Sequence, residues 1–161
     1  MDSFPPSRSR FELQAQLFGT YFALYQRLTR DADRELASFG ISSRQWLLLA
    51  VLTGQFPGEA PTLTDAARAY GTSRQNVRRL AEQLEQKGYV RIIEHTEGLR
   101  TVRIELTDNV AAFDTPEALA RQAALFDHLF GRLLDDELAE LTRLVDSCRT
   151  GIDAEPDGNE A

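Results

Sequence analysis

Several features are scarce in this sequence of 161 residues, and each scarcity excludes a class of protein. A single cysteine, Cys148, cannot form an intramolecular disulfide. The longest apolar run, residues 46–52, is far shorter than the roughly 20 residues that cross a bilayer, so we expect no membrane-spanning helix. The N-terminal residues lack the basic and apolar regions of a signal peptide. We therefore expect a reduced, cytoplasmic protein with one hydrophobic core.

Catalytic and metal-binding patterns are also missing. The two histidines, His95 and His128, have no cysteine or histidine at ligand spacing, so we expect no metal and no cofactor. The acidic run at residues 135–137 is explained by helix capping. The sequence has no glycine-rich phosphate loop and no Gly-x-Ser-x-Gly motif, and no Ser-His-Asp arrangement can be argued. We therefore expect that the protein is not an enzyme.

Positive charge is scarce overall but gathers in the middle of the chain. The net charge is −7, yet residues 61–107 carry eight basic and six acidic residues, a local charge of +2 that leaves −9 elsewhere. An acidic body with a mildly basic segment can bind a polyanion through that segment. The negative net charge also keeps an alternative open, in which the segment binds another protein and not nucleic acid.

Both ends of the chain show helical periodicity. Apolar residues recur every three or four positions over residues 10–39, which predicts one long helix with an apolar stripe wide enough to pack against a second copy of the chain. Thr115-Pro116-Glu117 predicts a helix start, and Asp135 is expected to cap a last helix. That last helix is expected to turn four residues inward, Leu138, Leu141, Leu144 and Val145. We expect a flexible arm at 1–9 and a disordered acidic tail at 151–161.

The central segment predicts two short helices, a third helix and a hairpin. Ser42 and Gln45 have capping-box spacing for a helix over 43–53, Thr64 is a candidate cap for a helix over 65–70, and Ser73 caps a helix over 74–87. Alternating apolar residues over 90–106 then predict a β-hairpin with its tip near Gly98. This order predicts a mainly α fold with a small β-hairpin wing, the winged helix-turn-helix.

The third of these helices carries the candidate function. One face is apolar and the opposite face is polar, in a pattern that suits a helix lying in the major groove of DNA. The predicted buried residues are Val77, Leu80, Ala81 and Leu84. We expect Gln75 and Arg79 to approach base edges, and Ser73, Arg74 and Arg78 to hold phosphates, with Asn76 beside them.

The full pattern resembles the MarR-type transcriptional regulators. The residues that carry the likeness are Ser42-x-x-Gln45-Trp46-x-x-Leu49, Leu63-Thr64-x-x-Ala67, Gly71-x-Ser73-x-x-x-Val77-x-Arg79-x-x-x-x-Leu84-x-x-Lys87-Gly88-x-Val90, Arg100-x-Val102 and Leu106-Thr107. The resemblance implies a homodimer that binds double-stranded DNA, commonly a repressor released by a small molecule or an oxidant. It also implies a single domain over 10–150, with a winged helix at about 42–107 and dimerisation helices at about 10–39 and 115–150.

Further sites follow from the same resemblance. It places Arg100 and Arg103 of the wing against DNA, although Gly98 stands where the family has an aspartate, and Glu97 is the neighbouring acid. Three aromatic residues could line an effector cavity or belong to the core, namely Tyr21, Tyr25 and Trp46. Cys148 could sense oxidants, but a small inert residue in the core or an interface is the reading we favour.

Overall fold

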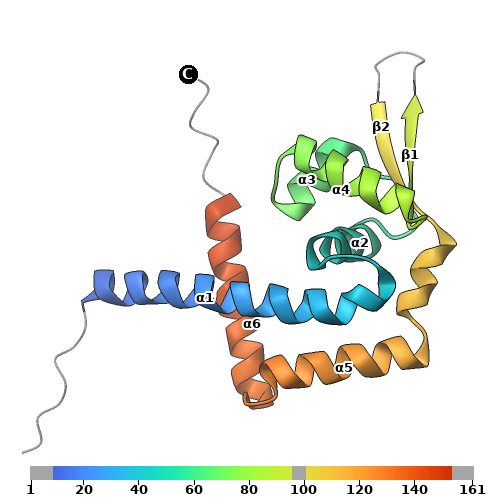
Figure 1. The fold of residues 1–161 in the computed structure, drawn as a ribbon. Coiled ribbons are helices and arrows are strands. Elements are labelled where there is room, and N and C mark those ends of the chain that lie inside the picture. The colour runs from blue at the N-terminus through green and yellow to red at the C-terminus, as the bar shows by residue number, and fades with distance from the viewer. Residues whose placement is uncertain (1–8, 96–100, 154–161) are drawn as a thin grey trace, which may run out of the picture. The chain divides into compact units, whose positions relative to one another are not determined.

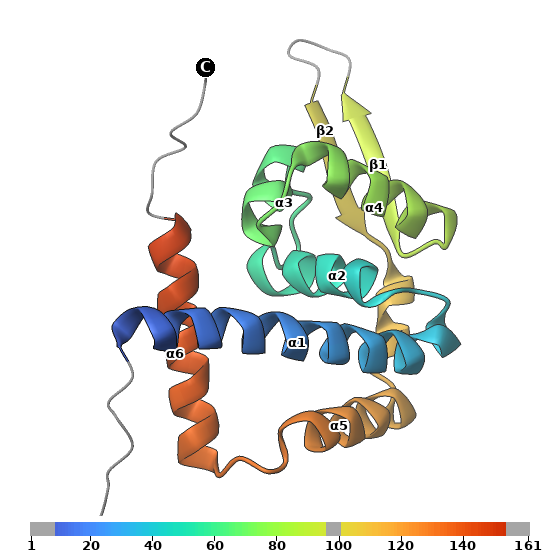
Figure 2. The same ribbon diagram turned by 60° about the vertical axis from the view of Figure 1, so that its left-hand side comes forward.

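The computed structural model describes residues 9–95 and 101–153 of the chain. By contacts, the chain divides into two compact units, residues 1–121 and 122–161, and the boundary falls within helix α5. The elements, drawn in Figures 1 and 2, are α1 (Arg10–Leu36), η1 (Ala37–Phe39), α2 (Ser43–Gln55), α3 (Leu63–Tyr70), α4 (Arg74–Gln86), β1 (Val90–His95), β2 (Thr101–Leu106), η2 (Asp108–Phe113), α5 (Pro116–Phe130) and α6 (Asp135–Asp153). The predicted fold, mainly α with one β-hairpin, is confirmed.

Capping residues explain where α2 begins and where the turn after α1 ends. The Ser42 side chain accepts from the N–H of Gln45, and the Gln45 side chain accepts from the N–H of Ser42, which is the predicted capping box. Helix α1 ends at Leu36, and the three residues that follow form a 3-10 turn. Gly40 closes this turn with a φ of 68°.

Two predicted caps are wrong. Helix α3 begins at Leu63, because the hydroxyl of Thr62, and not that of Thr64, accepts from the N–H of Asp65. Asp135 is the first residue of α6 and not its cap. The preceding residue, Leu134, donates its N–H to Glu137 and accepts from the N–H of Leu138. Before α3 two threonines stand close together, and only the backbone geometry selects Thr62 as the cap.

One predicted boundary differs from the structure, and several predictions concern residues that the structure does not describe. Helix α6 continues to Asp153, three residues into the segment predicted to be a disordered tail. The rest of that tail, most of the predicted arm and the hairpin tip with Glu97, Gly98 and Arg100 lie outside the described residues.

The hairpin is antiparallel, and its register pairs Val90 with Leu106 and Ile92 with Ile104. The segment before α3 extends this pairing, because Ile104 donates its N–H to the carbonyl of Pro61 and Thr62 forms a bridge with Arg103. A short third segment of extended chain therefore pairs with β2. This anchors the base of the wing to the helical core.

The hydrophobic core lies among α2, α3, α4 and the hairpin. Helix α4 contacts α2, α3 and β1, and Figures 1 and 2 show α2 beneath the α3–α4 pair with the hairpin beside α4. The most buried large side chains of this core are Leu48, Leu52, Val77, Leu84, Val90 and Ile104. At about 25 cal/mol per Å² of apolar surface, full burial of each such side chain stabilises the fold by roughly 1.5–3 kcal/mol.

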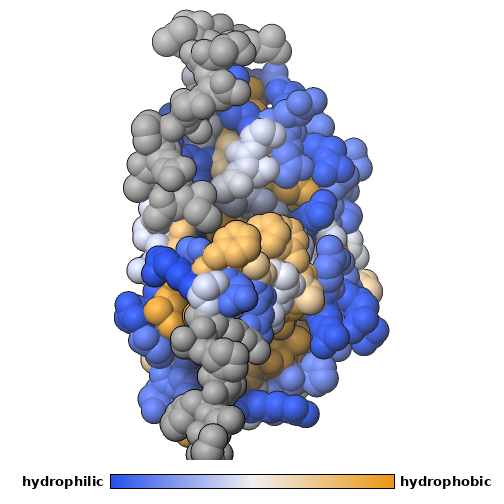
Figure 3. Space-filling view, turned by 90° about the vertical axis from the view of Figure 1, so that its left-hand side faces the viewer, coloured by the Kyte–Doolittle hydropathy of each residue, from blue (hydrophilic) through white to orange (hydrophobic). Residues whose placement is uncertain are grey.

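Helix α1 exposes a long row of large apolar side chains. Figure 3 views the side on which α1 begins, and an apolar area occupies the middle of that view. The exposed apolar residues of α1 are Phe11, Leu13, Leu17, Phe18, Tyr21, Phe22, Leu24 and Tyr25. Among the described residues, no single helix is long and apolar enough to cross a membrane. Within residues 9–95 and 101–153, one bent pair of helices, 10–39 and 43–55 at 80° to each other, is long and apolar enough when taken together, but α2 supplies core residues.

The prediction that α6 turns its leucines inward is wrong for the single chain. Leu138, Leu141, Leu144 and Val145 are all exposed. Cys148 on the same helix is also exposed, so it is not a core cysteine. Helical periodicity marks an apolar face but does not identify what covers it, which is why this face was assigned to the inside of one chain.

Candidate nucleic-acid interface

Helix α4 is held by its apolar face and presents its polar face outward. Val77, Leu80, Ala81 and Leu84 are buried, as the periodicity predicts. The turn from α3 depends on Gly71, whose φ of 77° is accessible to glycine at low cost. The Ser73 hydroxyl then accepts from the N–H of Asn76 at 3.3 Å and caps the helix.

The outward surface at the start of α4 forms a shallow concavity of about 450 Å³. It is lined by Ser73, Gln75, Asn76, Arg78, Arg79 and Glu82. The structure thus brings together five of the residues predicted to contact DNA. The sixth from this helix, Arg74, is also exposed.

Two arginines on this surface differ in how they are held. Arg79 donates to the side-chain oxygen of Asn76 at 3.1 Å, and Asn76 donates in turn to the hydroxyl of Thr72 at 3.2 Å. These two successive hydrogen bonds orient Arg79 without neutralising its charge. Within the described part of the chain, Arg74 makes no ion pair. Both guanidinium groups therefore keep a net positive charge at the surface.

Arg78 is held differently, between two carboxylates. Its Nε donates to Glu82 at 2.9 Å, and its Nη2 donates to Glu94 of β1 at 3.0 Å. The hydrogen bond to Glu82 and then that to Glu94 raise the pKa of Arg78. Glu82 is four residues from Arg78 on the same helix, a spacing at which side chains meet, whereas the contact with Glu94 depends on the fold.

Both described arginines of the wing, Arg91 and Arg103, are held by other residues. Arg103 donates to the carbonyl of Ala60 at 2.7 Å, and Arg91 pairs with Glu105 across the strands at 3.4 Å. Arg103 is exposed but tied to the loop before α3. The other predicted wing contact, Arg100, lies outside the described residues.

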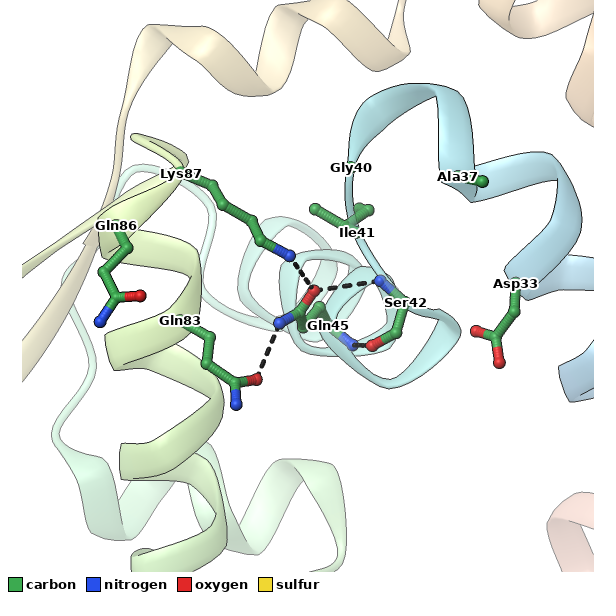
Figure 4. A pocket seen from close by; sticks show the side chains of 9 residues that line it. All are labelled: Asp33, Ala37, Gly40, Ile41, Ser42, Gln45, Gln83, Gln86 and Lys87. Carbon is green, nitrogen blue, oxygen red and sulfur yellow. Dashed lines mark hydrogen bonds between the residues drawn. The ribbon is translucent and has the colours of Figure 1, made fainter.

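The far end of α4 is fixed to α2 by a buried glutamine that sequence reasoning assigned only to a cap. Gln45 is 5% exposed; its amide donates to Gln83 at 2.8 Å, and its carbonyl accepts from Lys87 at 2.9 Å (Figure 4). These side chains line a second concavity of about 530 Å³, with Asp33 at the opposite end (Figure 4). A buried, fully bonded polar residue specifies one arrangement of the two helices.

The three aromatic residues predicted for an effector cavity are not gathered into one of these concavities. Tyr21 and Tyr25 are exposed on α1, and Trp46 is partly buried against the core. None of the three lines either concavity described above. Among the described residues, no group of three or more side chains is arranged to hold a metal ion.

Part of the sequence matches a family model, and the fold matches solved structures. The sequence pattern of the MarR family matches residues 39–100, which span α2 to the hairpin tip. Among curated proteins, none matches this sequence.

Three solved structures share the fold at low identity. A MarR family transcriptional regulator from Streptomyces coelicolor, in complex with DNA, is 20% identical and superposes with a TM-score of 0.73 over 98% of this chain and 97% of its own. An organohalide-sensing transcriptional regulator bound to 2,4-dichlorophenol is 19% identical, with a TM-score of 0.74 over 94% and 89%. A Bordetella bronchiseptica regulator whose DNA binding is regulated by 6-hydroxynicotinic acid is 20% identical, with a TM-score of 0.70 over 83% and 98%.

Proposed function

Because residues 39–100 match the MarR family and the fold is that of MarR-family regulators, we propose that this chain is a sequence-specific regulator of transcription that binds double-stranded DNA. The observation that carries the proposal is the two-sided build of α4. Its aliphatic face is buried, and its outward face groups Ser73, Gln75, Asn76 and Arg79 in one concavity. A helix of this kind fits a major groove, where arginine reads guanine and glutamine or asparagine reads adenine.

The proposed active form is a homodimer. The exposed apolar stripe of α1 needs a cover of matching chemistry, and a second copy of the chain supplies the same stripe. Two-fold symmetry would then present two α4 helices to one duplex. The expected operator is pseudo-palindromic, with half-sites about 10 bp apart or a multiple of it.

Repression and release by a small-molecule effector belong to the same proposal. The relatives bound to 2,4-dichlorophenol and regulated by 6-hydroxynicotinic acid support an effector of small aromatic character. Such a ligand would act by favouring a dimer geometry in which the two α4 helices no longer match the spacing of the half-sites. We place this activity in the cytoplasm and assign the protein no catalytic role.

Selection of bound duplexes from a random DNA pool by the purified protein tests the proposal. A palindromic enriched motif, with affinity that falls steeply as salt rises, is the expected result. The alternative is a winged-helix module that binds a protein partner, which the net charge of −7 favours. Lack of any enriched motif and of salt-dependent DNA binding would support that alternative and overturn DNA recognition.

A further inference from the structure

Arg78 links the recognition helix to the first strand of the wing. Its guanidinium lies between Glu82, one turn further along α4, and Glu94 of β1, at 2.9 and 3.0 Å. A second link lies seven residues on, where Glu85 accepts from the backbone N–H of Ile92 at 2.7 Å. Residues seven apart share one face of a helix. We call these five residues (Arg78, Glu82, Glu85, Ile92 and Glu94) the polar seam.

The polar seam separates Arg78 from the other arginines of α4. One guanidinium between two carboxylates has no positive charge left over, whereas Arg74 and Arg79 have no carboxylate partner among the described residues. Glu82 also lines the concavity that we assign to DNA. Without Arg78, the carboxylates of Glu82 and Glu94 would lose this cation, and carboxylates placed beside DNA phosphates disfavour a complex because like charges repel.

The seam is partly exposed, so it contributes little to global stability. The side chains of Arg78, Glu82 and Glu94 are 42%, 48% and 36% exposed. Ion pairs this open to water are screened and stabilise a fold weakly. The geometry is instead suited to fixing where the wing stands relative to α4, because the links join two elements that both face the proposed duplex.

We propose that Arg78 is a positioning residue that neutralises Glu82 and Glu94 and fixes β1 to α4, whereas Arg74 and Arg79 supply the charge offered to DNA. Arg78 was predicted from sequence to hold a phosphate, and its two carboxylate contacts point to this different role. The inference rests on the proposed DNA binding. In this proposal, Glu82 and Glu94 belong to the DNA interface through their contacts with Arg78.

Hydrogen exchange of the free, full-length protein tests the seam without DNA. We expect Arg78→Ala to speed amide exchange in residues 90–95 several-fold, because the link to Glu94 is lost. Arg74→Ala removes the same side chain from the same helix outside the seam and is expected to leave this exchange unchanged. Equal exchange in Arg78→Ala and the unaltered protein would overturn the seam.

A charge swap tests its role in binding. Arg78→Glu is expected to weaken binding to the selected duplex by about tenfold or more, and Arg78→Glu with Glu94→Arg to recover most of that loss. Arg78→Glu with Glu105→Arg carries the same net charge with the arginine on β2, and should not recover it. If both double variants stay as weak as Arg78→Glu, or both recover equally, the positioning role is overturned. Absence of duplex binding by the unaltered protein would instead overturn the proposed function.

Discussion

At the scale of single residues, Arg79 is the side chain most clearly arranged to read a base. Asn76 orients its guanidinium and leaves its charge free. Arg79→Ala should therefore cost ~1–3 kcal/mol of binding free energy on the selected duplex and relax the sequence preference. Affinity measured on the selected duplex and on single-base variants of it checks this. Equal losses on selected and random DNA would remove Arg79 from base recognition.

Arg74 should behave differently, because it stands at the helix start beside Ser73, where phosphates are favoured. Arg74→Ala is expected to weaken binding to all duplexes alike and to reduce the slope of log K against log salt by about 1.8 for the dimer, because one phosphate contact of about 0.9 is lost in each protomer. Titrations at four or more salt concentrations give this slope. A slope that matches the unaltered protein would contradict the phosphate role.

How far residue roles follow from sequence depends on whether the partners are local. The periodicity correctly predicted which face of α4 is buried, because that face repeats with the helix. It could suggest Glu82 as a partner of Arg78, since the two are one turn apart. Glu94 is 16 residues away, and only the packing of β1 beside α4 brings it to Arg78. The hydrogen bond between Gln45 and Lys87 joins residues 42 apart, so it could not be predicted from sequence spacing either.

At the scale of elements, helix starts are where sequence and structure differ most. The chain offers both Thr62 and Thr64 before α3, and the second was predicted to be the cap. Pro61 precedes the helix with its carbonyl accepting from Ile104, which fixes the backbone so that the Thr62 hydroxyl meets the N–H of Asp65 at 3.1 Å. The tertiary pairing with β2 therefore chose the cap, and local propensity alone could not.

The two threonines offer a matched test of this helix start. Thr62→Ala should lower the free energy of unfolding by about 1 kcal/mol, because the cap of α3 is lost, whereas Thr64→Ala should change it by less than about 0.5 kcal/mol. Urea unfolding followed by circular dichroism measures both. The reverse order of the two losses would restore Thr64 as the cap.

At the scale of the whole molecule, the exposed apolar surface and the local positive charge lie on different parts of the chain. The large exposed apolar side chains lie mainly on α1, α5 and α6, while the local positive charge lies over residues 61–107. Sequence periodicity found these helices but placed the leucines of α6 inside, because it cannot distinguish a face buried within one chain from a face buried between two copies. An apolar stripe alone does not name its cover.

Helix α1 gives the sharpest test of the dimer, because Phe18 is 68% exposed and its ring lies against that of Phe22 on its own helix, with 4.8 Å between ring centroids. Phe18→Glu should leave the helical signal unchanged but shift the mass in sedimentation from a dimer to the 18.1 kDa monomer. Ala23→Glu adds the same charge on the face of α1 opposite the stripe and should stay dimeric. Because two linked half-site contacts reinforce each other, Phe18→Glu should also bind the palindromic duplex roughly 100-fold more weakly, with a smaller change on a single half-site. A Phe18→Glu protein that remains a dimer, or a monomer that keeps full affinity for the palindrome, would separate DNA binding from this stripe.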